Sequence, residues 1–301
     1  MAIADDTLPT RKPVRPSTIP TPRTRRLGLV TSRRAAVLYA ALITGLAATM
    51  LPFAWMLLSS FKTQGEILRN PTGFWPAEPV WSNYARWFQE LHIEQFFFNS
   101  LFVAIVTVLG NLVFCSMVAY ALAKMDFPGK RVLFALVMIT LMTPVVVTFT
   151  PLFVLISKVG LVNTYPALFL PFLTTPVGVF LMRQFMLGIP NELIEAARLD
   201  GAGEAGIFAR IVMPLCGAPL ATLGILTFLF SWNNFLWPLV AAQSEDKYTL
   251  PVALSLFSTG QDATDYGLLL AGSVLVIGPI VLLFILLQRF FIQSVADAGI
   301  K

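Results

Sequence analysis

Few residues of this 301-residue chain have the types and spacing that enzymes use for chemistry. The single histidine, His92, belongs to no recognisable Ser/His/Asp arrangement, and no run of the form G-x-x-x-x-G-K-[ST] is present to cradle a phosphate. The two cysteines, Cys115 and Cys216, lack metal-ligand spacing, so we expect packing residues and no disulfide. The sequence therefore predicts no catalytic residue, no metal site and no cofactor held by this chain.

The most informative polar residues form one charged segment between two apolar stretches. They are Glu195, Ala196, Ala197, Asp200, Gly201, Ala202, Phe208, Ile211 and Pro214. Charges of this density do not cross the hydrocarbon core of a bilayer, so the segment must lie in water or against another protein. We predict a helix that begins at Pro190-Asn191, ends at Asp200-Gly201 and is followed by a second short helix, because glycine adopts the left-handed conformation that closes a helix.

The rest of the chain has the composition of a membrane protein. Hydrophobic residues make up 56% of it and charged residues 12%, against about a quarter charged in soluble domains. Each of six stretches without Asp, Glu, Lys, Arg or His is longer than the roughly 20 residues that a spanning helix needs. We predict an all-α integral membrane fold with six transmembrane helices, near residues 36–61, 97–123, 132–157, 165–187, 218–242 and 266–288.

The basic residues predict the orientation of these spans. The side that holds both termini and the Glu195 segment, which lies between the fourth and fifth spans, carries 16 Lys and Arg, and the other side carries 5. Because Lys and Arg accumulate in cytoplasmic loops, we expect the termini and this segment to be cytoplasmic. The net charge of +5 follows from the same bias, so we expect no nucleic-acid binding.

Three parts of the chain follow from this topology. We expect residues 1–34, which are basic and rich in proline, to be a disordered cytoplasmic tail, 35–293 to be the membrane domain, and 294–301 to be a cytoplasmic C-terminal tail. Between the first two spans, we expect the aromatic residues to form an interfacial belt: Trp75, Trp81, Tyr84 and Trp87. We expect residues 248–261, which contain Pro251, to be an external loop.

The third and fourth spans carry four prolines, Pro144, Pro151, Pro171 and Pro176, and we expect kinks there beside a pathway. Polar side chains within the charge-free stretches are the candidates for lining that pathway. Asparagine at depth needs a hydrogen-bond partner or a cavity, and amides beside aromatic faces suit the hydroxyls and the apolar ring face of a sugar. Serine and threonine often bond only to their own helix. Our candidates are Asn111, Thr143, Asn233, Asn234 and Trp237.

Read as E-A-A-x-x-D-G-A followed by F-x-x-I-x-x-P, the charged segment resembles the cytoplasmic coupling loop of binding-protein-dependent ABC importer permeases. Further motifs resemble the carbohydrate branch of that family, in particular the maltose-type second permease. They are Ser60-Phe61-Lys62-Thr63, Ala119-Tyr120-Ala121-Leu122-Ala123 with Phe127-Pro128-Gly129, Asn163-Thr164-Tyr165, and Trp232-Asn233-x-Phe235-x-Trp237-Pro238. The similarity runs from about residue 35 to 293.

The resemblance implies a permease subunit that translocates a carbohydrate across the inner membrane. The implied partners are a second homologous permease, a dimer of ATPase subunits that bind ATP and Mg, an extracytoplasmic solute-binding protein and the lipid bilayer. The residues from Glu195 to Pro214 would couple this chain to the ATPase, and residues 243–265 resemble the part that reaches toward the binding protein. An importer of glycerol-phosphate or phosphodiester compounds is the alternative, and an ion-coupled secondary transporter and a membrane scaffold are further ones.

Overall fold

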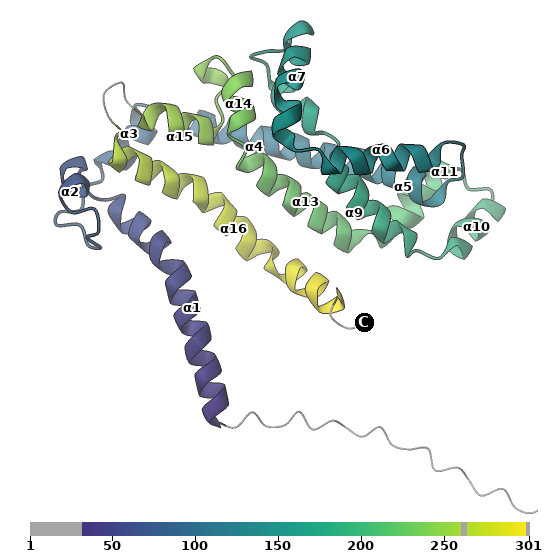
Figure 1. Cartoon of the computed structure of the whole chain (residues 1–301), viewed down its shortest axis with the longest axis horizontal. Coiled ribbons are helices and arrows are strands. Elements are labelled where there is room, and N and C mark those ends of the chain that lie inside the picture. The colour runs from purple at the N-terminus through teal and green to yellow at the C-terminus, as the bar shows by residue number, and fades with distance from the viewer. Residues whose placement is uncertain (1–31, 260–263, 299–301) are drawn as a thin grey trace, which may run out of the picture. The chain divides into compact units, whose positions relative to one another are not determined.

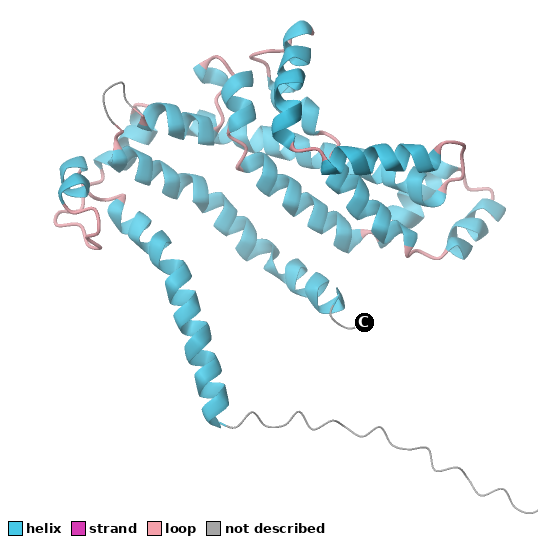
Figure 2. Ribbon diagram, in the orientation of Figure 1, coloured by secondary structure: helices cyan, strands magenta, loops and turns pink. Residues whose placement is uncertain are grey.

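The computed structural model describes residues 32–259 and 264–298. Within these ranges the chain consists of helices joined by loops and turns, with an isolated bridge between Thr259 and Thr264 (Figure 2). Residues 1–31 of the predicted N-terminal tail lie outside the described residues. Residues 294–298 of the predicted C-terminal tail form the end of helix α16 (Tyr266–Ala298).

The chain divides into two compact units, residues 1–51 and residues 52–301. Helix α1 (Ser32–Ser59) belongs to both, and its residues Ala35–Ser59 are long and apolar enough to cross a membrane. In the second unit, α4 (Ile93–Gly110), a π-helical turn η1 (Asn111–Cys115) and α5 (Ser116–Lys124) form one continuous apolar helix. A third apolar helix is the first part of α16.

Three further candidate spans are bent. Helices α6 (Lys130–Met142) and α7 (Val145–Lys158) meet at 104°, and α8 (Tyr165–Phe169) with η2 (Leu170–Phe172) meets α9 (Pro176–Leu187) at 40°. The residues of Glu204–Leu215 meet α13 (Gly217–Trp232) at 82°. By length and composition the described residues thus contain three spans, or six if each bent pair counts as one, and the count of six stays a prediction.

The kinks predicted at Pro144 and Pro176 are confirmed, because each proline follows a break and opens the next helical stretch. The segment predicted as the fifth span, near 218–242, is not a single helix. Helix α13 ends at Trp232, and α14 (Leu236–Ala241) begins after three non-helical residues. The cause is Pro238, which has no N–H to donate to the Asn234 carbonyl and whose ring would clash with that oxygen in a continuous helix.

The external loop predicted over residues 248–261 is wrong for most of its length. Residues Leu250–Ser258 form helix α15, preceded by the short 3₁₀ turn η4 (Glu245–Lys247). Pro251 lies in the first turn of α15, where a missing N–H costs no hydrogen bond. A proline that marks the beginning of a helix was therefore interpreted as a helix breaker.

The segment between the first two long helices folds into α2 (Gln64–Arg69) and α3 (Ser82–Gln89). Trp75 and Trp81 are exposed, as an interfacial belt requires. Trp87 is instead fully buried, and its Nε1 donates to the Leu268 carbonyl at 2.9 Å. Helix α3 is therefore anchored to α16 through a tryptophan of the core.

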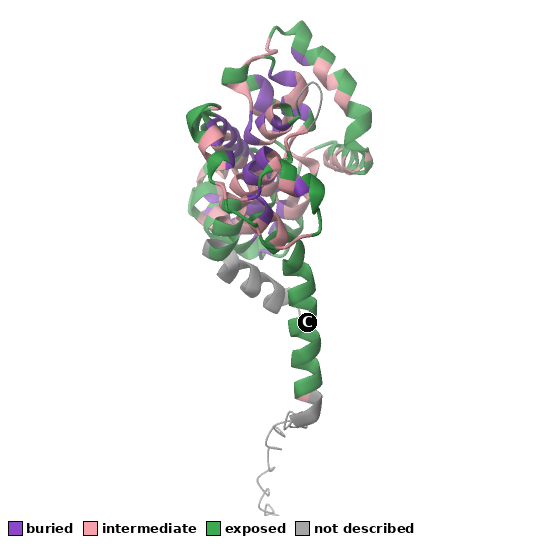
Figure 3. Ribbon diagram, turned by 90° about the vertical axis from the view of Figure 1, so that its left-hand side faces the viewer, coloured by how far each residue is buried: buried purple, intermediate pink, exposed green. Residues whose placement is uncertain are grey.

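The buried residues of the second unit form its interior (Figure 3). One cluster joins α5, α9 and the residues after Leu187, and it includes Met182, Met186 and Cys115. Both cysteines are free and buried, which confirms their prediction as packing residues. Helix α5 packs along α9 (Figure 1), so the region around Glu195 rests on these two helices.

Candidate functional site

The segment that we call the Glu195 loop, residues 188–216, begins with helix α10 (Asn191–Leu199) directly after Pro190. The helix ends in a Schellman arrangement: the Gly201 amide donates to the Arg198 carbonyl at 3.0 Å, and the Ala202 amide donates to the Ala197 carbonyl at 2.9 Å. Gly201 has φ +83°, and a Cβ at this position would meet nothing within 4 Å. Glycine is thus favoured here by backbone conformation and not by lack of space.

Helix α10 has two different faces. Ile194 and Ala197 are buried against the interior, whereas Glu195 and Ala196 are exposed. Leu199, in the last turn, is 89% exposed. Helix α10 therefore buries one face against the chain and leaves charged and apolar side chains exposed on the other.

The second half of the Glu195 loop consists of α11 (Glu204–Ile207), a π-helical turn η3 (Phe208–Val212) and α12 (Met213–Leu215). Phe208 and Ile211 pack against the interior, while Pro214 is exposed. The π turn precedes Pro214, whose ring crowds the Arg210 carbonyl and widens the turn. The wider turn places the buried residues five apart, at Ile207 and Val212.

Polar contacts attach the Glu195 loop to the end of α5. Tyr120 Oη donates to Glu204 Oε2 at 2.6 Å, and Arg198 Nε donates to Glu204 Oε1 at 2.8 Å. The hydrogen bond to Glu204 raises the pKa of Arg198, and the bonds from Arg198 and Tyr120 lower the pKa of Glu204, so this pair stays ionised at neutral pH. Lys124 Nζ donates to the Ile189 carbonyl at 2.6 Å and to Asn191 Oδ1 at 2.7 Å.

Asn111, a pathway candidate, lies fully buried in η1. Its Nδ2 donates to the carbonyls of Thr107 at 3.2 Å and Phe172 at 2.6 Å. Its Oδ1 accepts from Thr175 Oγ1 at 2.7 Å and from Cys115 Sγ at 3.2 Å. These four bonds use the full capacity of the amide, so Asn111 joins α5 to the break before α9.

Two other candidates also make contacts within the chain. Thr143 lies at the bend between α6 and α7, and its hydroxyl donates to the Ile139 carbonyl at 2.9 Å. Trp237 is buried, and its Nε1 donates to the Ala167 carbonyl at 2.8 Å. Trp237 thereby holds α14 against α8.

Asn233 and Asn234 occupy the break between α13 and α14. Asn233 is exposed, with its Nδ2 donating to the Leu229 carbonyl at 2.8 Å, and Asn234 is half-buried. Non-helical backbone inside an apolar span is tolerated only where it is buried in protein or faces water. Of the five candidates, only Asn233 and Asn234 combine a place in non-helical backbone with a side-chain amide that is not fully buried.

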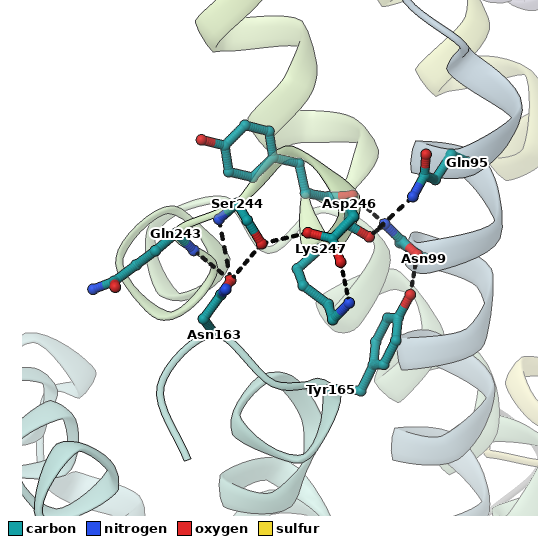
Figure 4. Close-up of polar contacts among 9 residues, drawn as sticks. Gln95, Asn99, Asn163, Tyr165, Gln243, Ser244, Asp246 and Lys247 are labelled. Carbon is teal, nitrogen blue, oxygen red and sulfur yellow. Dashed lines mark hydrogen bonds and ion pairs between the residues drawn. The ribbon is translucent and has the colours of Figure 1, made fainter. Parts of the chain in front are cut away.

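A polar cluster beyond α14, which the sequence prediction did not include, fixes residues 243–248 (Figure 4). Asn163, at φ +61°, accepts through Oδ1 from the amides of Gln243 at 2.9 Å and Ser244 at 3.1 Å. We call the contacts of Asn163, Asn99 and Tyr165 with this segment the Asn163 clamp. Asn99 lies in α4, Tyr165 in α8 and Asn163 in the turn before α8, so parts of the chain far away in sequence hold residues 243–248.

In the same clamp, Asn99 Nδ2 donates to the carbonyls of Asp246 at 3.0 Å and Tyr248 at 2.9 Å, and Tyr165 Oη donates to Asn99 Oδ1 at 2.8 Å. Lys247 lies 4.8 Å from the centre of the Tyr165 ring and forms an ion pair with Asp246. The bond from Lys247 lowers the pKa of Asp246. Two residues of the Asn163-Thr164-Tyr165 motif thus position the segment that follows the broken fifth span.

Comparison with known proteins gives a match over most of these helices. The family model described as "Binding-protein-dependent transport system inner membrane component" matches residues 111–297. The arabinooligosaccharides transport system permease protein AraQ of Halalkalibacterium halodurans is 46% identical, over 83% of this chain and 90% of that protein. The diacetylchitobiose uptake system permease protein NgcG of Streptomyces coelicolor is 32% identical, over 89% of this chain and 90% of that protein.

The sn-glycerol-3-phosphate transport system permease protein UgpE of Agrobacterium fabrum is 31% identical, over 85% of this chain and 94% of that protein. A solved structure, titled "Crystal structure of a bacterial ABC transporter involved in the import of the acidic polysaccharide alginate", contains a chain with a TM-score of 0.76. It is 22% identical and covers 87% of this chain and 98% of that chain. At this identity the likeness concerns the fold alone.

Proposed function

Because this chain belongs to the family of binding-protein-dependent transport system inner membrane components, we propose that it imports a carbohydrate as one permease subunit of an ATP-driven transporter. It is a transport subunit and not an enzyme. The relatives named for arabinooligosaccharides and diacetylchitobiose support a carbohydrate, and the first of them is more similar to this chain than the relative named for glycerol-3-phosphate.

The proposed coupling site is the Glu195 loop, which docks onto one subunit of an ATPase dimer that binds ATP and Mg. The observation that carries this proposal is the two-faced helix α10, with Ile194 and Ala197 buried and Glu195, Ala196 and Leu199 exposed. The remaining partners are a second homologous permease and an extracytoplasmic solute-binding protein. Both termini and the Glu195 loop lie in the cytoplasm, as the distribution of Lys and Arg predicts.

The proposed solute pathway passes the break between α13 and α14. Asn233 and Asn234 offer amide groups to the hydroxyls of a sugar there. Asn111, Thr143 and Trp237 have an indirect role in this proposal. Each stabilises a break or bend beside the pathway through hydrogen bonds within the chain. Most of the sugar contacts are left to the second permease, which completes the pathway.

Transport of a phosphate compound is the second candidate, supported by the relative named for sn-glycerol-3-phosphate. A fixed anion site within the membrane requires a basic side chain at depth. The six charge-free stretches contain none, so a phosphate site would depend on the second permease. This difference favours a neutral carbohydrate.

The test is reconstitution in lipid vesicles of this chain with the permease and ATPase that copurify with it, together with the binding protein. An arabinooligosaccharide, diacetylchitobiose and glycerol-3-phosphate are offered in turn. We expect uptake of one carbohydrate to require ATP and the binding protein. Uptake driven by an ion gradient without ATP would instead identify a secondary transporter, and ATPase binding without any uptake would identify a scaffold.

A further inference from the structure

Two side chains of α5 bind opposite ends of helix α10. Tyr120 and Lys124 are four residues apart, so they lie on the same face of α5. Lys124 binds the beginning of α10, at the Ile189 carbonyl and Asn191 Oδ1. Tyr120 binds Glu204, which in turn holds Arg198 in the last turn of α10.

The two contacts suit the transfer of motion. Helix α10 has nine residues and is about 14 Å long at 1.5 Å per residue. A helix held at one end can pivot, whereas a helix held at both ends by one neighbour must move with it. The Arg198–Glu204 pair alone is too exposed to fix the end of α10, with side chains 42% and 39% exposed, so the bond from Tyr120 is needed to anchor that pair to α5.

The middle of the continuous helix formed by α4, η1 and α5 contacts a break in the fourth candidate span. Asn111, nine residues before Tyr120, binds the Phe172 carbonyl and Thr175 on the two sides of that break. Between these points, Arg183 of α9 donates to the Leu122 carbonyl at 3.3 Å and lies 3.8 Å from the centre of the Phe134 ring. The helix formed by α4, η1 and α5 therefore connects the Glu195 loop to the kink in the fourth span by direct bonds.

We propose that Tyr120 and Lys124 are positioning residues that make α5 move together with α10 when the ATPase moves it. The second span then receives the motion directly, in addition to the fourth and fifth spans, to which the Glu195 loop is joined through the chain. This inference rests on the proposed function, because the motion originates in an ATPase docked on α10.

The test removes each contact with little change in side-chain volume, by Tyr120→Phe, Lys124→Met and the double substitution. Tyr266→Phe and Lys158→Met are matched controls, since they make the same chemical deletions elsewhere in the second unit. In the reconstituted transporter we measure solute imported per ATP hydrolysed. We expect a decrease of about threefold for each single variant and about tenfold for the double, because each substitution removes the net contribution of a partly exposed hydrogen bond, at the low end of the usual range. The controls and Lys124→Arg should stay near the native ratio.

A second measurement needs no transported solute. Spin labels at Leu193→Cys on α10 and Met117→Cys on α5, in a background without native cysteines, report whether the two helices move together. In the native complex with the ATPase, the distance should stay constant when ATP is added, and in the double variant it should change. A constant distance in both, or an equal change in both, would overturn the proposal.

A double-mutant cycle separates this role from general destabilisation. If Tyr120 acts through Glu204, then Tyr120→Phe added to Glu204→Ala should lower the transport ratio no further than Glu204→Ala alone. Additive effects would contradict the proposed contact. Loss of ATPase copurification in the Tyr120 and Lys124 variants would also overturn the inference, because these residues would then only shape the docking surface. Failure of the native chain to bind any ATPase is a different result, and it would refute the proposed function itself.

Discussion

Replacing Gly201 by valine tests whether the shape of the Glu195 loop matters for transport. Gly201 closes helix α10 at φ +83°, where an ordinary L-residue loses about 1–2 kcal/mol and a β-branched one loses more. No atom within 4 Å of the added Cβ would clash, so the whole cost is conformational. The chain relieves that strain by giving up the two closing bonds, from the amides of Gly201 and Ala202.

At about 1.4 kcal/mol for each factor of ten, this strain lowers the population of the native loop by about five- to thirtyfold if the opened loop is accessible. We expect solute uptake and solute-stimulated ATPase activity of Gly201→Val to fall within that range, with the membrane level of the protein unchanged. Gly201→Asn should retain more activity, because asparagine tolerates the left-handed conformation.

The matched control is Gly203→Val. Gly203 lies two residues further along, also has nothing within 4 Å of an added Cβ, and adopts an ordinary φ of −73°. This substitution adds the same side chain to the same loop without backbone strain. Uptake by Gly201→Val equal to that of Gly203→Val would refute the conformational argument, and native uptake by both would remove Gly201 from the coupling site.

Two further predictions follow from single contacts and a third from the orientation of the spans. Asn233→Leu should lower uptake while leaving thermal stability near native, whereas Asn111→Leu should cost about 1–3 kcal/mol because it leaves buried partners unpaired; unfolding scans and uptake assays separate the two. Burial raises the pKa of Asp265, but bonds from the Leu268 amide and from Arg86 outweigh it and the pKa lies below 3.8, so the stabilisation by Asp265 is complete above about pH 4 and is lost below it. When the pH falls from 5 to 3, past the ordinary aspartate pKa near 3.9, the native protein should therefore lose more thermal stability than the Asp265→Asn variant. With the native cysteines removed, Glu90→Cys should react with an impermeant thiol reagent in intact cells and Glu192→Cys should not; the reverse pattern would place the Glu195 loop outside the cell.

Local sequence signals predicted the Glu195 loop well. Pro190 and Gly201 determine backbone angles at the two ends of α10, and this information is carried by the residues themselves. The same holds for the breaks at Pro144 and Pro176. The break before Pro238 was not predicted, because the effect of this proline falls four residues earlier, at Asn234, within a stretch whose lack of charged residues indicated one span.

The burial of individual side chains was much harder to predict. In a membrane span, the face toward lipid and the face toward protein are both apolar, so hydrophobic periodicity does not distinguish them. Trp87 and Trp237 show the consequence, because tryptophan suits both an interfacial belt and a core with a hydrogen-bond acceptor nearby. Tyr120 and Lys124 gave a usable signal in their spacing of four, but their partners lie in a distant part of the sequence.

The polar residues of the spans differ in what they bind. Asn111, Asn99 and Trp237 donate to backbone carbonyls of breaks, turns or short helices, so each replaces bonds that a continuous helix would have made for itself. Irregular backbone is stable at those places because a side chain of the same protein satisfies it. The break at Asn233 is different, since its exposed amide bonds only to the preceding turn at Leu229 and keeps the capacity for further bonds. An amide with unused bonding capacity in an apolar span needs water, a second protein or a solute as its partner, and a transport pathway between two permeases provides all three.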